Sequence, residues 1–235
     1  MLLTGAAHCA RVRLALSRPS EHSVRVTAPD FSATYDALAS RFDEWSAQVE
    51  PDVRAEWGSK VVECIPAGER VVELGCGTGV PVGRMLSSHY AYTGVDTSEG
   101  MLEKARRSVG ADATLLRADM HSVRFAPASL GAVVAFYSIS HTPREQHASL
   151  LRRVASWLRP GGVFVGNLHY FDDPDDFDEN WLGAGPMRWS GFDGATNRRL
   201  LVDAGFVVVE CEAISQTEPD GSKICPMWFS ARRET

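Results

Sequence analysis

The stretch VVELGCGTGVPVGRML, Val71–Leu86, places three glycines within five residues, between an apolar run and a segment with helical spacing. In an open parallel sheet, a loop that follows a strand and opens a helix lies at the carboxyl ends of the strands, where such folds bind ligands. Glycines there let the backbone turn tightly and approach a ligand without a clash at Cβ. The stretch therefore predicts a ligand site.

Outward from this loop, apolar strands alternate with helical segments. Strands are predicted over 70–74, 91–95, 113–116, 131–137 and 163–168, and helices over 81–88, 98–108, 143–158 and 194–204. Such alternation is typical of βαβ units and a mostly parallel sheet. Two final apolar runs, 206–214 and 223–231, are joined by a short Pro-Asp-Gly turn, which favours antiparallel neighbours. Helical spacing also predicts two N-terminal helices, over 31–50 and 53–65.

We expect one domain over residues 31–235, in which the acidic, aromatic and glycine-rich segment 169–191 forms a long loop or lid. Residues 1–26 carry four arginines, several serines and one acid. That composition is similar to an organelle transit sequence. A disordered extension over 1–30, or a start codon placed too early, explains it more simply.

Composition limits the classes of partner. A net charge of -6 argues against a protein that grips nucleic-acid backbones, although six carboxylates within 172–179 equal that charge and leave room for a basic surface elsewhere. No apolar run approaches the roughly 18 residues needed to cross a bilayer. The five cysteines are scattered without a C-x-x-C pair, which argues against a disulfide framework and fits a reducing cytoplasm. We therefore expect a cytoplasmic protein without a nucleic-acid or membrane partner.

Residues beside the glycine loop indicate a nucleotide without phosphate. The dinucleotide fingerprint needs glycine at position 80, where valine stands, and the lysine of a P-loop is absent. Glu73 would repel a phosphate but attract an ammonium or sulfonium group. Asp96, at the end of the next strand, can accept both hydroxyls of a ribose. Asp119 ends the third strand, where it can accept from an exocyclic amine of adenine.

Each of these signals has a structural alternative, since glycine turns are common and strand-end aspartates often cap helices. Their combination is specific, and the chain resembles the class I S-adenosylmethionine-dependent methyltransferases over roughly residues 31–235. The matching motifs are ELGCGTG at 73–79, GVDTSEGML at 94–102, ADM at 118–120 and LRPGG at 158–162. The resemblance implies a doubly wound α/β fold with a seven-stranded, mostly parallel sheet of order 3-2-1-4-5-7-6 and an antiparallel last strand.

The resemblance also implies a cofactor, S-adenosylmethionine, and its product S-adenosylhomocysteine. Gly75 and Gly77 would line the methionine part, Asp96 would bind the ribose, and Asp119 and Met120 would meet the adenine. The other expected cofactor-binding residues are Glu73, Thr97, Met101 and Phe136. Tyr35 and Phe42 lie in a segment that resembles the family's N-terminal helix, which folds over the cofactor. The alternative for these two aromatic residues is plain core packing.

His141 follows the fourth strand, close to where the methyl group should lie. Because histidine titrates near neutrality, it is the candidate general base, with capping of the next helix as the alternative. The expected acceptor pocket consists of Tyr137, His169, Tyr170, Trp181 and Trp189. A small satellite core is the alternative for the tryptophans. No metal is expected, because the acidic run 172–179 is better explained as a solvated loop.

We therefore expect O- or N-methylation of a small molecule, in specialised metabolism. No N-P-P-Y or D-P-P-Y tetrapeptide follows the fourth strand, where Phe136–Ile139 stands, so DNA and glutamine amides are disfavoured acceptors. Two alternatives stay open. One is an aminopropyl transferase on a related fold, and the other is a cofactor-binding module without catalytic activity.

Overall fold

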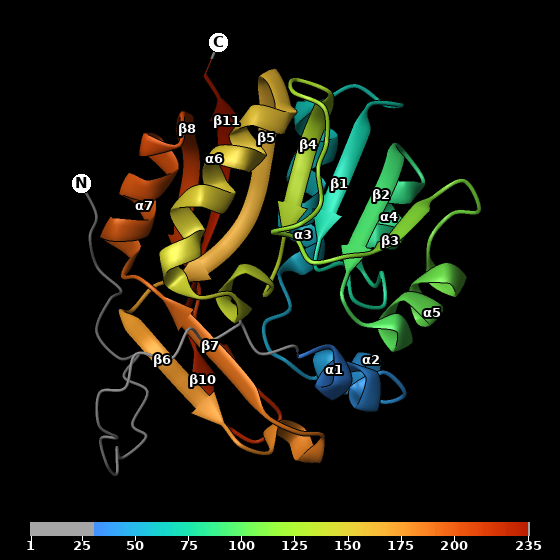
Figure 1. Cartoon of the computed structure of the whole chain (residues 1–235), viewed down its shortest axis with the longest axis vertical. Coiled ribbons are helices and arrows are strands. Elements are labelled where there is room, and N and C mark those ends of the chain that lie inside the picture. The colour runs from blue at the N-terminus through green and yellow to red at the C-terminus, as the bar shows by residue number, and fades with distance from the viewer. Residues whose placement is uncertain (1–30, 235) are drawn as a thin grey trace.

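The structure, a computed structural model, describes residues 31–234. The expectations for residues 1–30 lie outside that range. A central seven-stranded sheet has the order β3-β2-β1-β4-β5-β11-β8 (Figure 1). The strands are β1 Arg70–Leu74, β2 Ala91–Asp96, β3 Thr114–Arg117, β4 Leu130–Ala135, β5 Leu158–His169, β8 Phe206–Ala213 and β11 Pro226–Arg233. Only β11 runs antiparallel to its neighbours in this sheet, which confirms the predicted order and the antiparallel last strand.

Helices cover both faces of the sheet because its strands are apolar on both sides. In β4, Val133 and Ala135 pack with α6 (His147–Trp157) and α7 (Gly194–Asp203). The alternate residues Ala132 and Val134 pack with α3 (Arg54–Cys64) and α4 (Val82–Ser87). Successive side chains of a strand point to opposite faces, so one short strand serves both cores. A further helix, α5 (Glu99–Ser108), packs beside α4.

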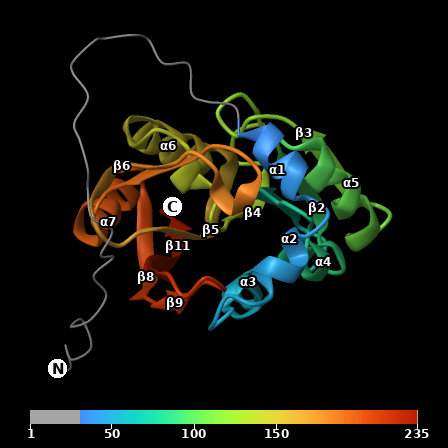
Figure 2. The same ribbon diagram turned by 90° about the horizontal axis from the view of Figure 1, so that it is seen from below.

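The N-terminal segment forms two short helices, α1 (Ser32–Leu38) and α2 (Phe42–Ser46), where one helix over 31–50 was predicted. The break contains no proline or glycine. It falls where Leu38 and Ala39 are buried against Met101 of α5, so tertiary packing overrides the helical propensity of the segment. Figure 2 shows α1 and α2 lying across the carboxyl ends of β1 and β2.

The predicted loop over 169–191 is instead largely a hairpin, in which β6 (Asp173–Asp178) pairs antiparallel with β7 (Met187–Gly191). Aspartate is a poor strand former, which made a solvated loop the expectation. The pairing is stabilised from β7: Arg188 forms an ion pair with Asp175 and lies 5.0 Å from the ring centre of Phe177. Between the two strands, η3 (Trp181–Gly183) makes a short 3₁₀ turn.

The ends of several other helices and strands also differ from those predicted from the sequence. The helix predicted over 143–158 is a 3₁₀ turn, η2 (Arg144–Gln146), followed by α6, and β5 already begins at Leu158. A preceding 3₁₀ turn, η1, covers Ile139–His141. The Pro-Asp-Gly turn is flanked by two short strands, β9 (Gln216–Thr217) and β10 (Lys223–Ile224), which form a separate small sheet. No helix within residues 31–234 has the length and apolar character needed to cross a bilayer.

Candidate active site

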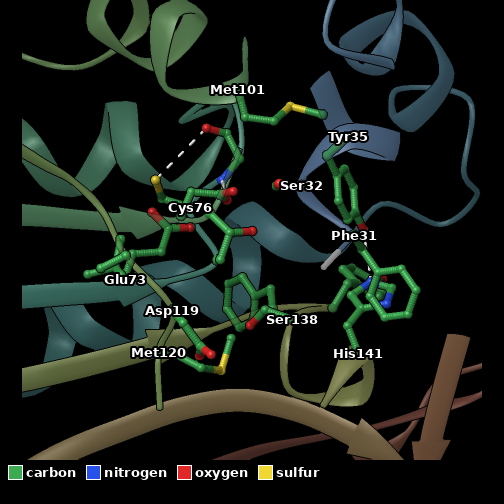
Figure 3. A pocket seen from close by; sticks show the side chains of 18 of the residues that line it. Phe31, Ser32, Tyr35, Glu73, Cys76, Met101, Asp119, Met120, Ser138 and His141 are labelled. Atoms are coloured by element: carbon green, nitrogen blue, oxygen red, sulfur yellow. Dashed lines mark hydrogen bonds between the residues drawn. The ribbon is translucent and has the colours of Figure 1, made fainter. Parts of the chain in front are cut away.

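A cavity of about 540 Å³ opens at the carboxyl ends of β1, β2 and β4, beneath α1 and α2 (Figure 3). It brings together thirteen of the residues that the sequence placed at the site. These are Tyr35, Phe42, Glu73, Gly75, Gly77, Asp96, Thr97, Met101, Asp119, Met120, Phe136, Tyr137 and His141. In Figure 3, Asp119 and Met120 lie on one side of the cavity and Tyr35 and His141 on another.

Gly75 and Gly77 of the glycine loop lack a side chain for two different structural reasons. At Gly75, φ is +73° and an added Cβ would lie 2.3 Å from Cβ of Ser138, so only glycine fits against the end of β4. At Gly77, φ is +53° and an added Cβ would meet no atom within 4 Å. The first glycine is required by packing, and the second leaves open space along the cavity wall.

Asp96 ties the two loops of the cavity floor together. Its Oδ2 accepts from the backbone N–H of Gly77 at 2.8 Å, and its Oδ1 accepts from the N–H of Ser98 at 2.9 Å. Burial raises the pKa of this carboxyl, while the backbone donors oppose that rise. With both oxygens held by fixed amides, the carboxylate is pre-oriented to accept further hydrogen bonds.

Glu73 is 5% exposed and accepts from the hydroxyl of Tyr92 at 2.5 Å. Burial raises its pKa to about 8. A carboxyl with this pKa is largely protonated at pH 7, and a nearby cation favours its ionised form. The Glu73 carboxyl can therefore ionise beside a positively charged ligand.

On the opposite side of the cavity, Asp119 accepts from the backbone N–H of His121 at 2.7 Å. His121 itself is half-buried and also lines the cavity. Burial lowers its pKa. His147 is 1% exposed on the first turn of α6, where its Nε2 lies 3.1 Å from the carbonyl oxygen of Thr142.

His141 is held between two partners. Its Nδ1 lies 3.2 Å from the carbonyl oxygen of Arg188, which can only accept, so Nδ1 carries the proton. Its Nε2 therefore accepts from the hydroxyl of Tyr35, which lies 2.8 Å away. Desolvation lowers the pKa of His141 to about 4. Burial, with the charge of Asp96, raises the pKa of Tyr35 above its usual range, so both groups are neutral at pH 7.

Four residues expected in the acceptor pocket do not line this cavity: His169, Tyr170, Trp181 and Trp189. The rings of Trp181 and Trp189 instead pack behind Tyr35 and His141, at centroid distances of 5.7 and 5.8 Å. His169 packs against Gly191, and Tyr170 against Gly194, at the base of the hairpin and of α7. The position of His169 and Tyr170 at the end of β5 was predicted correctly, but their place in the wall of this cavity was not.

Sequence reasoning missed one polar residue at the cavity wall, and it predicted a second, Tyr137, without its hydrogen-bond partner. Arg54, at the start of α3, lines the cavity and is held by Asp52 through an ion pair of 2.8 Å. Tyr137 has a φ of +51°, which is a strained conformation for a bulky residue. The Tyr137 hydroxyl donates to the side-chain oxygen of Gln216 at 2.5 Å. Arg54, Tyr137 and Gln216 come from distant segments, so no local motif indicates the position of Arg54 or the contact between Tyr137 and Gln216.

Comparison with known proteins supports the resemblance. Residues 71–162 match the family model described as a methyltransferase domain. Over 218 residues the chain is 35% identical to 27-O-demethylrifamycin SV methyltransferase of Amycolatopsis mediterranei, covering 87% of this chain and 74% of that protein. The chain belongs to the class I S-adenosylmethionine-dependent methyltransferases.

Two further similarities are more limited. A dTDP-3-amino-3,4,6-trideoxy-alpha-D-glucopyranose N,N-dimethyltransferase of Streptomyces venezuelae is 29% identical, with 54% of this chain matching 52% of that protein. The matched segment thus spans about half of that relative. A 1,6-didemethyltoxoflavin-N1-methyltransferase structure from Burkholderia thailandensis has a TM-score of 0.65 at 16% identity, over 92% of this chain and 94% of that one, and shows the shared fold.

The residues of the cavity fit S-adenosylmethionine. Gly77 leaves open space along the wall, and the carboxyl groups of Glu73, Asp96 and Asp119 supply oxygen atoms that can accept from amines and hydroxyls. The cavity volume lies within the range of small-molecule sites. Within residues 31–234, no group of three or more His, Cys, Asp or Glu side chains is arranged to hold a metal ion.

Proposed function

We propose that this protein transfers a methyl group from S-adenosylmethionine to a hydroxyl or amine of a small molecule, in specialised metabolism, with Tyr35 and His141 removing the proton of the acceptor. The observation that carries the proposal is the 2.8 Å hydrogen bond between these two side chains inside the cavity formed by the glycine loop. When bound, the cofactor supplies an electrophilic methyl group on a sulfonium.

The glycine loop and strand ends hold the cofactor in this proposal. Gly75 and Gly77 border the methionine part, Asp96 receives the ribose hydroxyls, and Asp119 with Met120 borders the adenine. Arg54 is an additional candidate, because its guanidinium lines the cavity and could pair with a carboxylate of the ligand.

The hydrogen-bond directions define a route for the proton. Tyr35 donates its own proton to Nε2 of His141, which leaves the lone pairs of its oxygen available to an acceptor hydroxyl. As the methyl group bonds to the oxygen of the acceptor, the proton of the acceptor hydroxyl passes to the oxygen of Tyr35. At the same time, the Tyr35 proton passes to Nε2 of His141. The products are a neutral tyrosine and an imidazolium whose Nδ1 proton is held by the carbonyl of Arg188.

For a hydroxyl acceptor, a base with a pKa of about 4 suffices for this task. A free hydroxyl is a weak acid, but an oxygen that has gained a methyl group is an oxonium and loses its proton readily. Proton removal is therefore most favourable late in the reaction, and positioning supplies much of the remaining rate.

The two relatives support a small-molecule acceptor, since one is named for an O-demethyl substrate and the other for N,N-dimethylation of an amino sugar nucleotide. The test is incubation of the protein with methyl-labelled cofactor and a panel of phenols, alcohols and amines. We expect a labelled product in equal amount to S-adenosylhomocysteine. Tight cofactor binding without any labelled product would favour the non-catalytic module. Turnover of the decarboxylated cofactor alone would favour aminopropyl transfer.

A further inference from the structure

The helices over the cavity carry two carboxylates that bind the loops beneath them. Asp36 of α1 uses one oxygen, Oδ1, to accept from the hydroxyl of Ser98 at 2.5 Å and from the backbone N–H of Gly100 at 2.8 Å. Ser98 caps α5 by accepting from the N–H of Met101 at 3.1 Å. Asp36 thus completes the capping of α5 from a helix 62 residues earlier in the chain, and a carboxylate is favourable at a helix N-terminus.

Asp43 of α2 makes the equivalent contact with the glycine loop. Its Oδ1 accepts from the hydroxyl of Thr78 at 2.5 Å, and its Oδ2 lies 3.5 Å from Nζ of Lys104 on α5. Thr78 is 2% exposed and lines the cavity between Gly77 and Gly79. The glycine loop is therefore attached to the overlying helix by its own side chain.

Together with Asp96, these two carboxylates link the glycine loop, the start of α5 and the helices α1 and α2 to one another. Asp96 joins the glycine loop to the start of α5, through Gly77 and Ser98. Asp36 and Asp43 then attach each of those two loops to the overlying helices. The same helices place Tyr35 and Phe42 in the cavity wall, so the helices that close the site are fastened to the loops expected to hold the cofactor.

Packing brings α1 to the same place independently of charge. An added Cβ at Gly100 would lie 3.1 Å from Cβ of Ala39 and 3.2 Å from Cα of Asp36, so α1 approaches α5 more closely than most side chains permit. Leu38 and Ala39 are buried there against Met101. The apolar contact sets the approach, and the two carboxylates fix the helices over the loops.

We infer that Asp36 and Asp43 are positioning residues that hold α1 and α2 closed over the bound cofactor and thereby set its rate of exchange. The inference rests on the proposed function, because it takes the ligand to be S-adenosylmethionine or its product. Release of that ligand past Tyr35 and Phe42 requires both helices to move, and each carboxylate contact must break first.

The test measures dissociation of radiolabelled S-adenosylhomocysteine into excess unlabelled ligand, for the full chain and for Asp36→Ala and Asp43→Ala. We expect the dissociation rate to rise about tenfold in each variant, as loss of a hydrogen bond to a charged group predicts. The association rate should change less. Asp43→Asn, which keeps an oxygen for Thr78, should restore most of the slow dissociation.

The matched control is Glu44→Gln, which neutralises the neighbouring exposed carboxylate of α2. A merely structural role would lower the melting temperature of the ligand-free protein without a selective change in dissociation. Dissociation rates of both alanine variants equal to that of Glu44→Gln would overturn the inference while leaving the proposed function intact. Absence of S-adenosylhomocysteine binding by the unaltered protein would instead overturn the proposed function, and the inference with it.

Discussion

The hydroxyl of Tyr35 on α1 lies 2.8 Å from Nε2 of His141, which is 106 residues further along the chain. One partner belongs to the helices over the cavity and the other to the loop after β4. The proposed base is therefore complete only when α1 lies over the site. Closure and proton transfer depend on the same contact, so premature chemistry in an open site is disfavoured.

Replacing Tyr35 by phenylalanine tests the relay. The variant keeps the ring that packs on Trp181 and loses only the hydroxyl, so we expect the kcat to fall about 100-fold. The dissociation constant for S-adenosylhomocysteine should stay within about threefold. Tyr90→Phe is the control, because the Tyr90 hydroxyl contacts carbonyls of α3 and of Ile65, away from the cavity. A Tyr35→Phe enzyme with unchanged kcat would exclude the relay.

The pH dependence of kcat tests the state of His141. Its pKa is lowered to about 4, so the base is neutral, and active, at all higher pH values. We expect the acid limb of the profile to appear only as the pH falls towards 4, with no loss near pH 6.5. Circular dichroism at each pH should establish that the protein is still folded. A limb centred near pH 6.5 that disappears in His141→Gln would mean that the histidine is more solvated than the structure shows.

The two glycines predict opposite outcomes. Gly75→Ala places a methyl group 2.3 Å from Ser138 at a positive φ, so we expect a loss of roughly 3 kcal/mol in the free energy of unfolding. Gly77→Ala meets no atom, so it should cost only about 1 kcal/mol. Its methyl group enters the space expected for the cofactor and should weaken S-adenosylhomocysteine binding at least about tenfold. Urea unfolding and calorimetry distinguish the two, and equal effects on both quantities would contradict the assignment.

Glu73 makes stability depend on pH. Its pKa is about 8 in the folded protein and 4.5 ordinarily, so the folded state binds more protons than the unfolded state between these values. The contribution of this group to stability is therefore present below pH 4.5 and is lost as the pH rises to 8, by at most about 1.4 kcal/mol per pH unit.

Glu73→Gln removes this titration and keeps an oxygen for the Tyr92 hydroxyl. We expect the difference in the free energy of unfolding between the variant and the unaltered protein to grow in favour of the variant from pH 6 to pH 8. Urea titrations at three pH values measure this difference. A constant difference would show that Glu73 stays ionised.

The sheet and the part of the cavity that is lined by the glycine loop and the strand ends were predictable because their signals are local. Short apolar strands alternate with helical segments, and Gly75, Asp96 and Asp119 each stand at or just after the end of a strand. Parallel strands bring such ends to one edge without any knowledge of side-chain contacts. The same reasoning placed His141 and Tyr137 at the cavity.

The remainder depends on contacts between distant segments. His169 and Tyr170 also stand at the end of a strand, but His169 packs against Gly191 of the β6–β7 hairpin, and β6 lies in a run of aspartates with no strand pattern. The direction of the Tyr35 hydroxyl depends on a carbonyl of Arg188, through the tautomer of His141. Neither relationship has a signature in sequence spacing.

The most direct test of the central claim is calorimetric titration of the purified protein with S-adenosylhomocysteine, with NAD as the parallel control. We predict one binding site with a dissociation constant that is roughly micromolar for S-adenosylhomocysteine, and no heat of binding for NAD. Absence of S-adenosylhomocysteine binding, or equal binding of NAD, would contradict the assignment of this cavity to the methyl donor.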